Sequence, residues 1–228
     1  MATYLICHGA WSGGWSWKKI RVLLRAAGHE VVTPTYTGLG ERAHLAHPMV
    51  DLETHIQDVL SVAQYESLSD FILVGHSYGG MVVTGVADRL PERVRHLVYL
   101  DAFVPGDGQS LASLAGEGHS STRVEGWLIP PNPPPPDTSP EDAAWITPRR
   151  RHQPARCFSQ PLRLTRGTLP PRPRTYIHCT RKTGNDVFRQ FADRFRTDPT
   201  WRFHAMDASH SPNITAPEEL AALLLALA

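Results

Sequence analysis

An apolar run, Phe71–Val74, leads directly into Gly75-His-Ser77-Tyr-Gly79, and a second apolar stretch begins at Gly80. This pattern predicts a buried strand, a sharp turn and a helix, with Ser77 at the turn. A serine there has a strained backbone, which requires that the residues two before and two after it carry no clashing side chains. Its hydroxyl then lies at a helix N-terminus, where free N–H groups stabilise negative charge. The flanking strand and helix favour a nucleophile at Ser77 over a merely structural turn.

Short apolar runs alternate with amphipathic segments along most of the chain. The alternation predicts an α/β protein with a mostly parallel sheet of about six strands and helices on both faces. Strands are predicted at Tyr4–Cys7, Val31–Pro34, Phe71–Val74, His96–Leu100, Thr175–Cys179 and Trp201–Ala205. Helices are predicted near Trp17–Ala27, Leu52–Glu66, Gly80–Leu90, Val187–Arg196 and Pro217–Leu227.

One segment, residues 104–174, interrupts the alternation and is rich in proline and glycine. It is too long for a simple connection between core strands, so it is either a disordered linker or a cap folded over the active site. Its apolar anchors favour a cap inserted after the fourth strand, with the proline run at 130–136 as a stiff stretch within it. These anchors are Trp127, Leu128, Ile129, Trp145, Ile146, Phe158, Leu162 and Leu164. We therefore expect a core of residues 1–103 and 175–228 beneath a cap.

The composition agrees with a globular enzyme, because 228 residues can bury a sizeable core. The net charge of +1 gives no reason to expect nucleic acid as a partner. No apolar run approaches the ~20 residues of a membrane span, and the first residues do not form a signal peptide. The three cysteines, Cys7, Cys157 and Cys179, form no C-x-x-C pair and are expected as free thiols. We expect a cytoplasmic protein with a small-molecule substrate, and a homodimer is left open.

A serine nucleophile needs a base within hydrogen-bond reach and an acid that orients the base. In this fold class the order along the chain is serine, acid, histidine. His210 lies between the last predicted strand and the last predicted helix, at the sheet edge where catalytic groups collect. His178 and His204 lie inside predicted strands. An exposed loop imidazole is the alternative for His210, which we take as the base.

Three carboxylates are candidates for the acid. Asp101 ends the strand expected beside the serine strand, so it is presented at the same sheet edge. Asp186 follows the next strand, and Asp207 lies only three residues before the histidine. Asp101 is favoured, Asp186 is the main alternative, and the position of Asp207 is more typical of a turn.

Two backbone donors are needed to stabilise an oxyanion. The Tyr78 N–H, directly after the nucleophile, is the first, and the Ala10 N–H in the glycine-rich turn His8–Trp15 is the second. Glycine-rich turns after a first strand also bind dinucleotide phosphates. Because this turn does not spell G-x-G-x-x-G, we expect no nucleotide cofactor.

Other binding signals are weaker. Arg149-Arg150-Arg151 is interpreted as a solvated cluster rather than a site for an anionic substrate group. Histidine and acidic residues show no metal-ligand spacing, so neither a metal nor another cofactor is expected. Trp127, Trp145 and Phe158 are the candidate walls of an apolar substrate pocket.

His8-Gly9-Ala10, Gly13–Trp17 and Gly75–Gly80 together resemble the α/β-hydrolase superfamily. Within it the chain looks like small bacterial carboxylesterases related to the plant methylesterase and hydroxynitrile lyase group. Three further sequence segments strengthen the resemblance: Thr35–Arg42, Leu52–Ile56 and Leu100–Pro105. The resemblance implies a six-stranded parallel core that lacks the first two strands of larger hydrolases. It also implies the serine, the histidine and the two oxyanion donors named above.

The chain departs from that group at two places. The plant methylesterases have their acid in a Cys-Thr-x-Asp-like motif. In this chain the corresponding segment is Cys179-Thr-Arg-Lys182, with a lysine at the position of the acid. Asp101 is the natural substitute, and haloalkane dehalogenases have their acid at a similar location. Plant hydroxynitrile lyases carry a threonine and a lysine where Gly9 and Ser211 stand here, which disfavours cyanohydrin cleavage.

The sequence therefore predicts a serine carboxylesterase that hydrolyses small, fairly apolar esters through an acyl-enzyme intermediate. An amide, carbamate or lactone hydrolase with the same triad is the alternative, since only the leaving group differs. A non-catalytic ligand-binding homologue is disfavoured by the complete set of serine, histidine and acid.

Overall fold

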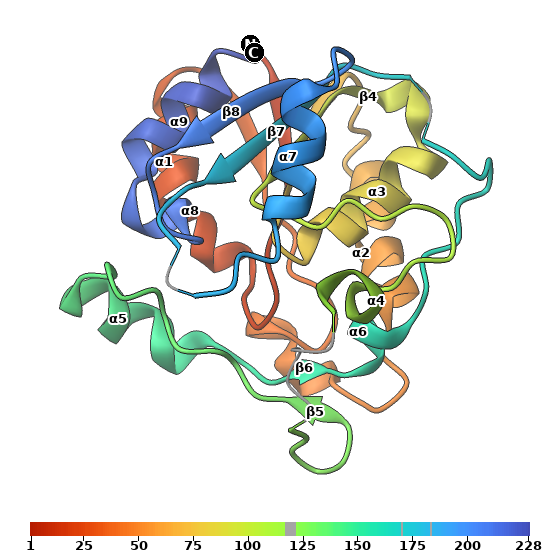
Figure 1. The fold of residues 1–228 in the computed structure, drawn as a ribbon, viewed down its shortest axis with the longest axis vertical. Coiled ribbons are helices and arrows are strands. Elements are labelled where there is room, and N and C mark those ends of the chain that lie inside the picture. Colours follow the sequence, from red (N-terminus) through yellow and green to blue (C-terminus); the bar gives the residue numbers. More distant parts are fainter. Residues whose placement is uncertain (117–121, 170, 183) are drawn as a thin grey trace.

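The computed structural model describes residues 1–116, 122–169, 171–182 and 184–228. A six-stranded sheet with the order β2-β1-β3-β4-β7-β8 forms its centre (Figure 1). Every neighbouring pair of these strands runs parallel. The strands are β1 (Thr3–Cys7), β2 (Glu30–Val32), β3 (Phe71–His76), β4 (Val94–Leu100), β7 (Arg174–Cys179) and β8 (Arg202–Met206).

The register of the central strands determines which loops meet. His76 at the end of β3 pairs with Leu100 at the end of β4, so the residues that follow, Ser77 and Asp101, leave the sheet side by side. On the other side of β3, Cys7 pairs with Gly75, so the loop after β1 begins at the same edge. The carboxyl ends of parallel strands are where ligands of open α/β sheets bind.

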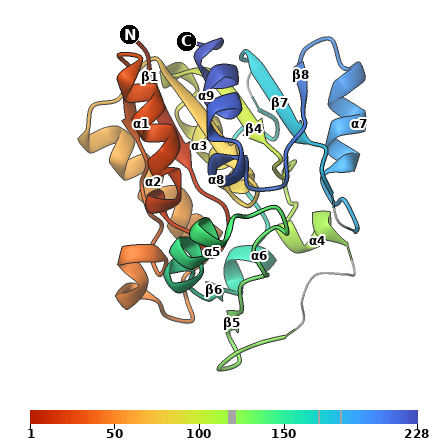
Figure 2. The same ribbon diagram turned by 90° about the vertical axis from the view of Figure 1, so that its left-hand side faces the viewer.

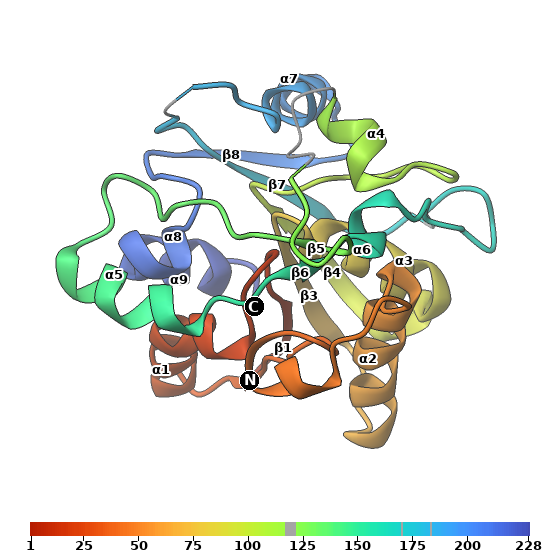
Figure 3. The ribbon, with the colours of Figure 1, turned by 90° about the horizontal axis from the view of Figure 1, so that it is seen from below.

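Helices cover both faces of the sheet, and Figure 3 shows α1 and α9 on one side with α2 and α3 on the other. Successive strand residues face opposite sides. Leu5 therefore belongs to the cluster with α2, α3 and α7, whereas Tyr4 belongs to the cluster with α1 and α9. Each fully buried Leu or Ile side chain contributes roughly 1.5–3 kcal/mol. These helices and the neighbouring α8 are α1 (Lys18–Ala26), α2 (Leu52–Tyr65), α3 (Gly79–Arg89), α7 (Arg189–Thr197), α8 (Pro212–Thr215) and α9 (Pro217–Leu225).

Within residues 104–174, the described part from 104 to 159 lies beyond the carboxyl ends of the strands, at the opposite end of the molecule from the chain termini (Figure 2). Residues 117–121 and 170 of this segment lie outside the described residues. A two-stranded antiparallel pairing joins β5 to β6, and apolar side chains such as Ile129, Ile146 and Phe158 are buried. The described elements are α4 (Leu111–Ala115), β5 (Leu128–Ile129), α5 (Pro140–Ile146), β6 (Gln153–Pro154) and α6 (Arg156–Ser159).

Short 3-10 helices complete the described elements. They are η1 (Gly14–Trp17), η2 (Gly40–Leu45), η3 (Pro91–Arg93) and η4 (Thr147–Arg149). The predicted α/β class is confirmed, and each predicted strand and helix matches an observed element with its ends within two residues. The short elements of residues 104–174, together with α8, were not predicted.

The three cysteines are buried and unpaired, as expected. Burial raises the pKa of Cys7 and of Cys157 to about 12, so both remain thiols at neutral pH.

Among the described residues, no helix has both the length and the apolar character needed to cross a membrane. The cytoplasmic location stays a prediction.

Candidate active site

Ser77 occupies the turn between β3 and α3 with a left-handed φ of 56°. A Cβ on Gly79 would lie 2.4 Å from the Cys7 carbonyl oxygen, and one on Gly75 would lie 2.6 Å from Val83 Cγ2. Larger residues at either position would therefore displace the backbone or the helix. The two glycines thus allow the tight turn that exposes the serine hydroxyl beyond the end of the sheet.

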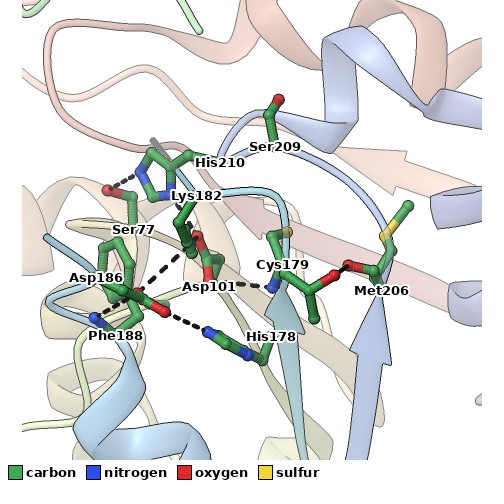
Figure 4. Close-up of polar contacts among 12 residues, drawn as sticks. Ser77, Asp101, His178, Cys179, Lys182, Asp186, Phe188, Met206, Ser209 and His210 are labelled. Carbon is green, nitrogen blue, oxygen red and sulfur yellow. Dashed lines mark hydrogen bonds and ion pairs between the residues drawn. The ribbon is translucent and has the colours of Figure 1, made fainter. Parts of the chain in front are cut away.

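His210 lies in the loop between β8 and α8, and its Nε2 is 3.0 Å from Ser77 Oγ (Figure 4). The backbone carbonyl of the same residue accepts a hydrogen bond of 2.6 Å from His76 Nε2. The imidazole ring also stacks on Phe188, with centroids 4.9 Å apart and planes at 13°. The ring is therefore held at the serine by contacts from β3 and from the loop before α7.

Asp101 follows β4 and accepts a hydrogen bond of 2.6 Å from His210 Nδ1 at its Oδ2. The other carboxylate oxygen accepts the Cys179 N–H at 3.2 Å. The residue is completely buried. Burial opposes its ionisation most strongly, but the hydrogen bonds and charges of His210 and Lys182 together hold its pKa below the usual value. An ionised Asp101 fixes the tautomer that leaves Nε2 free to accept the serine proton.

Lys182 donates a hydrogen bond from its ammonium group to the same Oδ2 of Asp101. Its Nζ also lies 3.7 Å from Asp186 Oδ1 and 5.1 Å from the centre of the Phe188 ring. The position that departs from the plant methylesterase pattern thus carries a cation against the buried acid. The sequence analysis did not predict this contact, which joins residues 81 positions apart.

Asp186, the alternative acid, has a different partner. Its Oδ2 accepts a hydrogen bond of 2.9 Å from His178 Nε2, and its Oδ1 accepts the Phe188 N–H at 3.1 Å. Asp207 forms an exposed ion pair with Arg181, at 2.8 Å and 2.9 Å. Neither carboxylate is bonded to the histidine beside Ser77, so Asp101 is the acid that the geometry favours.

The Ala10 and Tyr78 N–H groups, expected as oxyanion donors, donate to no other group in the part of the chain that the structure describes. Tyr78 precedes α3 directly, so its N–H belongs to the open N-terminus of a helix. A Cβ on Gly9 would lie 3.2 Å from the Cβ of Ser77, so the loop after β1 contacts the turn closely. Both donors therefore border the space in front of the serine.

A buried polar network that sequence analysis missed supports both donors. His8 donates from Nδ1 to the Gly9 carbonyl at 2.7 Å and accepts the Tyr36 N–H at its Nε2. The hydroxyl of Tyr78 is hydrogen-bonded to His55 Nδ1 at 2.9 Å. Burial lowers the pKa of His8 to about 3 and that of His55 to about 4, so both rings are neutral. Only the proximity of His8 to the glycine-rich turn hinted at this role.

A cavity of about 550 Å³ opens in front of Ser77 and His210. The described part of residues 104–174 contributes Leu111, the prolines at 133–136 and Ile146 to its wall. Its principal apolar and aromatic lining residues are Trp11, Trp15, Phe103, Leu111, Ile146, Phe158, Val187, Phe188 and Ile214.

Of the three predicted pocket residues, Phe158 lines the cavity, whereas Trp127 and Trp145 do not. The Trp145 ring lies edge-on against Trp15 at 5.3 Å, so Trp15 takes the place at the wall. Trp127 instead belongs to the turn before β5, where its carbonyl accepts the Ala155 N–H. In addition, the described residues contain no group of three His, Cys, Asp or Glu side chains that could hold a metal ion.

The model of the alpha/beta hydrolase family matches residues 4–223. A carbendazim hydrolyzing esterase from Nocardioides sp. (strain SG-4G) is 41% identical over 244 aligned residues, which cover 100% of both chains. Salicylic acid-binding protein 2 from Nicotiana tabacum is 30% identical over 55% of this chain and 48% of its own length. An extracellular alpha/beta-hydrolase from a Paenibacillus species has a TM-score of 0.83 and 26% identity, covering 99% of this chain and 98% of its own.

Proposed function

The chain belongs to the alpha/beta hydrolase family, and we propose that it is a serine carboxylesterase with Ser77 as nucleophile, His210 as base and Asp101 as acid. The continuous hydrogen-bonded series from Ser77 Oγ through His210 to Asp101 supports this assignment most directly. The esterase named above, aligned along the whole of both chains, supports ester hydrolysis as the reaction.

In the acylation step, Ser77 Oγ attacks the ester carbonyl carbon while His210 Nε2 takes the hydroxyl proton. The carbonyl oxygen becomes an oxyanion that the N–H groups of Ala10 and Tyr78 stabilise. The intermediate collapses, the C–O bond to the alcohol breaks, and His210 returns its proton to the departing alcohol. Asp101 stabilises the imidazolium that exists between the two proton transfers.

In the deacylation step, water attacks the acyl-serine ester and gives its proton to His210. The acyl–oxygen bond to Ser77 then breaks, His210 returns the proton to Ser77 Oγ, and the carboxylic acid leaves. The same oxyanion donors serve both steps, because the carbonyl carbon of the acyl group does not move between them.

The substrate class follows from the cavity. A volume of about 550 Å³ and a mainly aromatic and aliphatic wall suit small, fairly apolar esters. Carbendazim, the compound named for the relative with 41% identity, is the first individual substrate to test. Carbamates, amides and lactones belong in the same panel, since their hydrolysis would use the same residues with a different leaving group.

Two measurements test the proposal together. Wild-type protein should hydrolyse p-nitrophenyl butyrate and take up one equivalent of a fluorophosphonate, whereas Ser77→Ala should lose both properties while keeping its fold. We expect turnover to fall by about 10⁶ in the variant, because the members of a triad act as a unit. Rapid hydrolysis by Ser77→Ala would overturn the assignment of the nucleophile. A folded wild type that neither reacts with the fluorophosphonate nor cleaves any ester would favour a binding module instead.

A further inference from the structure

Arg150 differs from the two arginines beside it in the sequence. It follows η4, is half-buried and lines the cavity that contains Ser77 and His210, whereas Arg149 and Arg151 are exposed. Its guanidinium donates to the Asn132 carbonyl and lies over the Trp11 ring, 5.6 Å from the ring centre. The sequence-based view of this triplet as a uniformly solvated cluster is therefore wrong for Arg150.

No carboxylate in the described part of the chain forms an ion pair with Arg150. The other two cations that line the cavity, Arg181 and Lys182, each form ion pairs with aspartates. Burial alone lowers the pKa of Arg150 to about 10, so the guanidinium stays charged at neutral pH. A partly buried cation without an acid is unfavourable, and an anion brought by a ligand would relieve that cost.

The position of the guanidinium is fixed relative to the reacting centre through Trp11. The Trp11 N–H donates to Gln153 Oε1 at 3.0 Å, and its indole N–H donates to the Ile129 carbonyl at 3.0 Å. Its own carbonyl accepts the Arg151 N–H at 3.1 Å. Because Trp11 directly follows Ala10, these bonds connect the oxyanion loop to the segment that carries Arg150.

We propose that Arg150 selects esters that carry a second, anionic group, a carboxylate first of all, at a distance from the scissile ester. This inference rests on the proposed esterase function and names the substrate class within it. Neutral esters still fit the apolar wall, but they leave the guanidinium without an anionic partner. The planar guanidinium can donate two parallel hydrogen bonds to a carboxylate, which an ammonium group cannot do.

Matched substrate pairs test the proposal. In one pair, p-nitrophenyl hydrogen glutarate is compared with p-nitrophenyl pentanoate, so that the charge lies in the acyl part. In the other pair, 4-acetoxybenzoate is compared with 4-acetoxybenzamide, so that the charge lies in the alcohol part of the ester. Arg150→Gln should lower kcat/KM for the anionic member of at least one pair by about 10- to 100-fold. The neutral members should change by less than about twofold.

Two further variants act as controls. Arg149→Gln removes an exposed neighbouring arginine and should leave all four substrates unchanged. Arg150→Lys keeps the charge but loses the paired donors, and it should recover part of the preference for the anion. Equal changes for anionic and neutral substrates in Arg150→Gln, or no change in either pair, would overturn the proposal.

A measurement on the wild type keeps the proposal testable if Arg150→Gln does not fold. Benzoate should inhibit hydrolysis of p-nitrophenyl butyrate competitively, with an inhibition constant about tenfold below that of the neutral benzamide. Equal inhibition by the two compounds would contradict a role for Arg150 in anion recognition. Failure of the esterase assignment itself gives a different result, in which no neutral ester is hydrolysed at all.

Discussion

The carboxyl edge of the sheet and residues 104–174 border the same cavity but hold their side chains by different means. Ser77 and Asp101 directly follow two paired, largely buried strands, whose register aligns the two residues. In the described part of residues 104–174, the side chains that line the cavity instead come from helices of one or two turns and from a proline run. Rigid elements hold reacting groups in place, whereas loops tolerate change. We therefore propose that the sheet edge carries the chemistry and that residues 104–174, the overlying segment, contribute to substrate choice.

After Ser77→Ala, the largest effect is expected for Asp101→Asn, which tests the sheet edge. Asp101→Asn should keep the geometry but supply the wrong tautomer of His210, and turnover should fall by about 10³–10⁴. Asp186→Asn is the matched control, because that carboxylate is bonded to His178. It should cost less than about tenfold. Steady-state kinetics on both variants measures this, and the reverse order would return the acid to the loop after β7.

Acid stability provides the second test, because three buried histidines, His8, His55 and His76, lie near the carboxyl edge of the sheet. Burial lowers the pKa of His8 and His76 to about 3 and that of His55 to about 4. Below pH 6.5 the unfolded chain therefore binds more protons than the native one. The free energy of unfolding then falls as the pH is lowered, until the pH reaches the pKa values of the histidines in the folded state. Asp101, with its lowered pKa, keeps its stabilising charge throughout this window.

Between pH 7.5 and 5.5 each of these histidines should cost about 1.4 kcal/mol, or about 4 kcal/mol together. Urea unfolding at the two pH values measures the difference. An unfolding free energy that stays constant over this range would mean that the rings are charged or solvated in the native state. The support for the oxyanion loop would then need a different explanation.

Replacing Lys182 should have a smaller effect on catalysis at the same edge of the sheet than replacing Asp101. Its ammonium group helps to hold the pKa of Asp101 below the usual value, so Lys182→Met should make Asp101 easier to protonate and shift the acidic limb of the kcat/KM profile to higher pH. Lys182→Arg retains the charge and should restore the wild-type profile. A pH profile that does not move in the methionine variant would limit Lys182 to a purely structural role.

The smallest expected effect concerns the overlying segment. Phe158→Ala should enlarge the cavity and shift the preference among p-nitrophenyl acyl chains by about tenfold, with little loss of rate for the preferred chain. Trp127→Ala removes an aromatic side chain of the same segment that does not line the cavity, and its selectivity should match the wild type. Equal shifts in both variants would mean that the segment acts as a whole rather than through its lining residues.

The extent of prediction from sequence differs between these two regions for a physical reason. The apolar run before Ser77 and the glycines around it are local signals, so strand, turn and helix follow from adjacent residues. Asp101 could be proposed because a strand end presents its next residue at the sheet edge. The orientation of Arg150 and Trp145, and the contact of Lys182 with Asp101, depend on long-range packing that no local pattern encodes.

If Ser77 forms the acyl-enzyme, the acyl group must be found on this residue during turnover. Wild-type protein is mixed with excess p-nitrophenyl acetate, quenched in acid within the first turnovers, digested and analysed by mass spectrometry. We predict one acetyl group per chain on the peptide that contains Ser77, and none on that peptide in Ser77→Ala. An acetyl group on another residue of the wild type, or full turnover by Ser77→Ala, would contradict the role of Ser77 as the nucleophile.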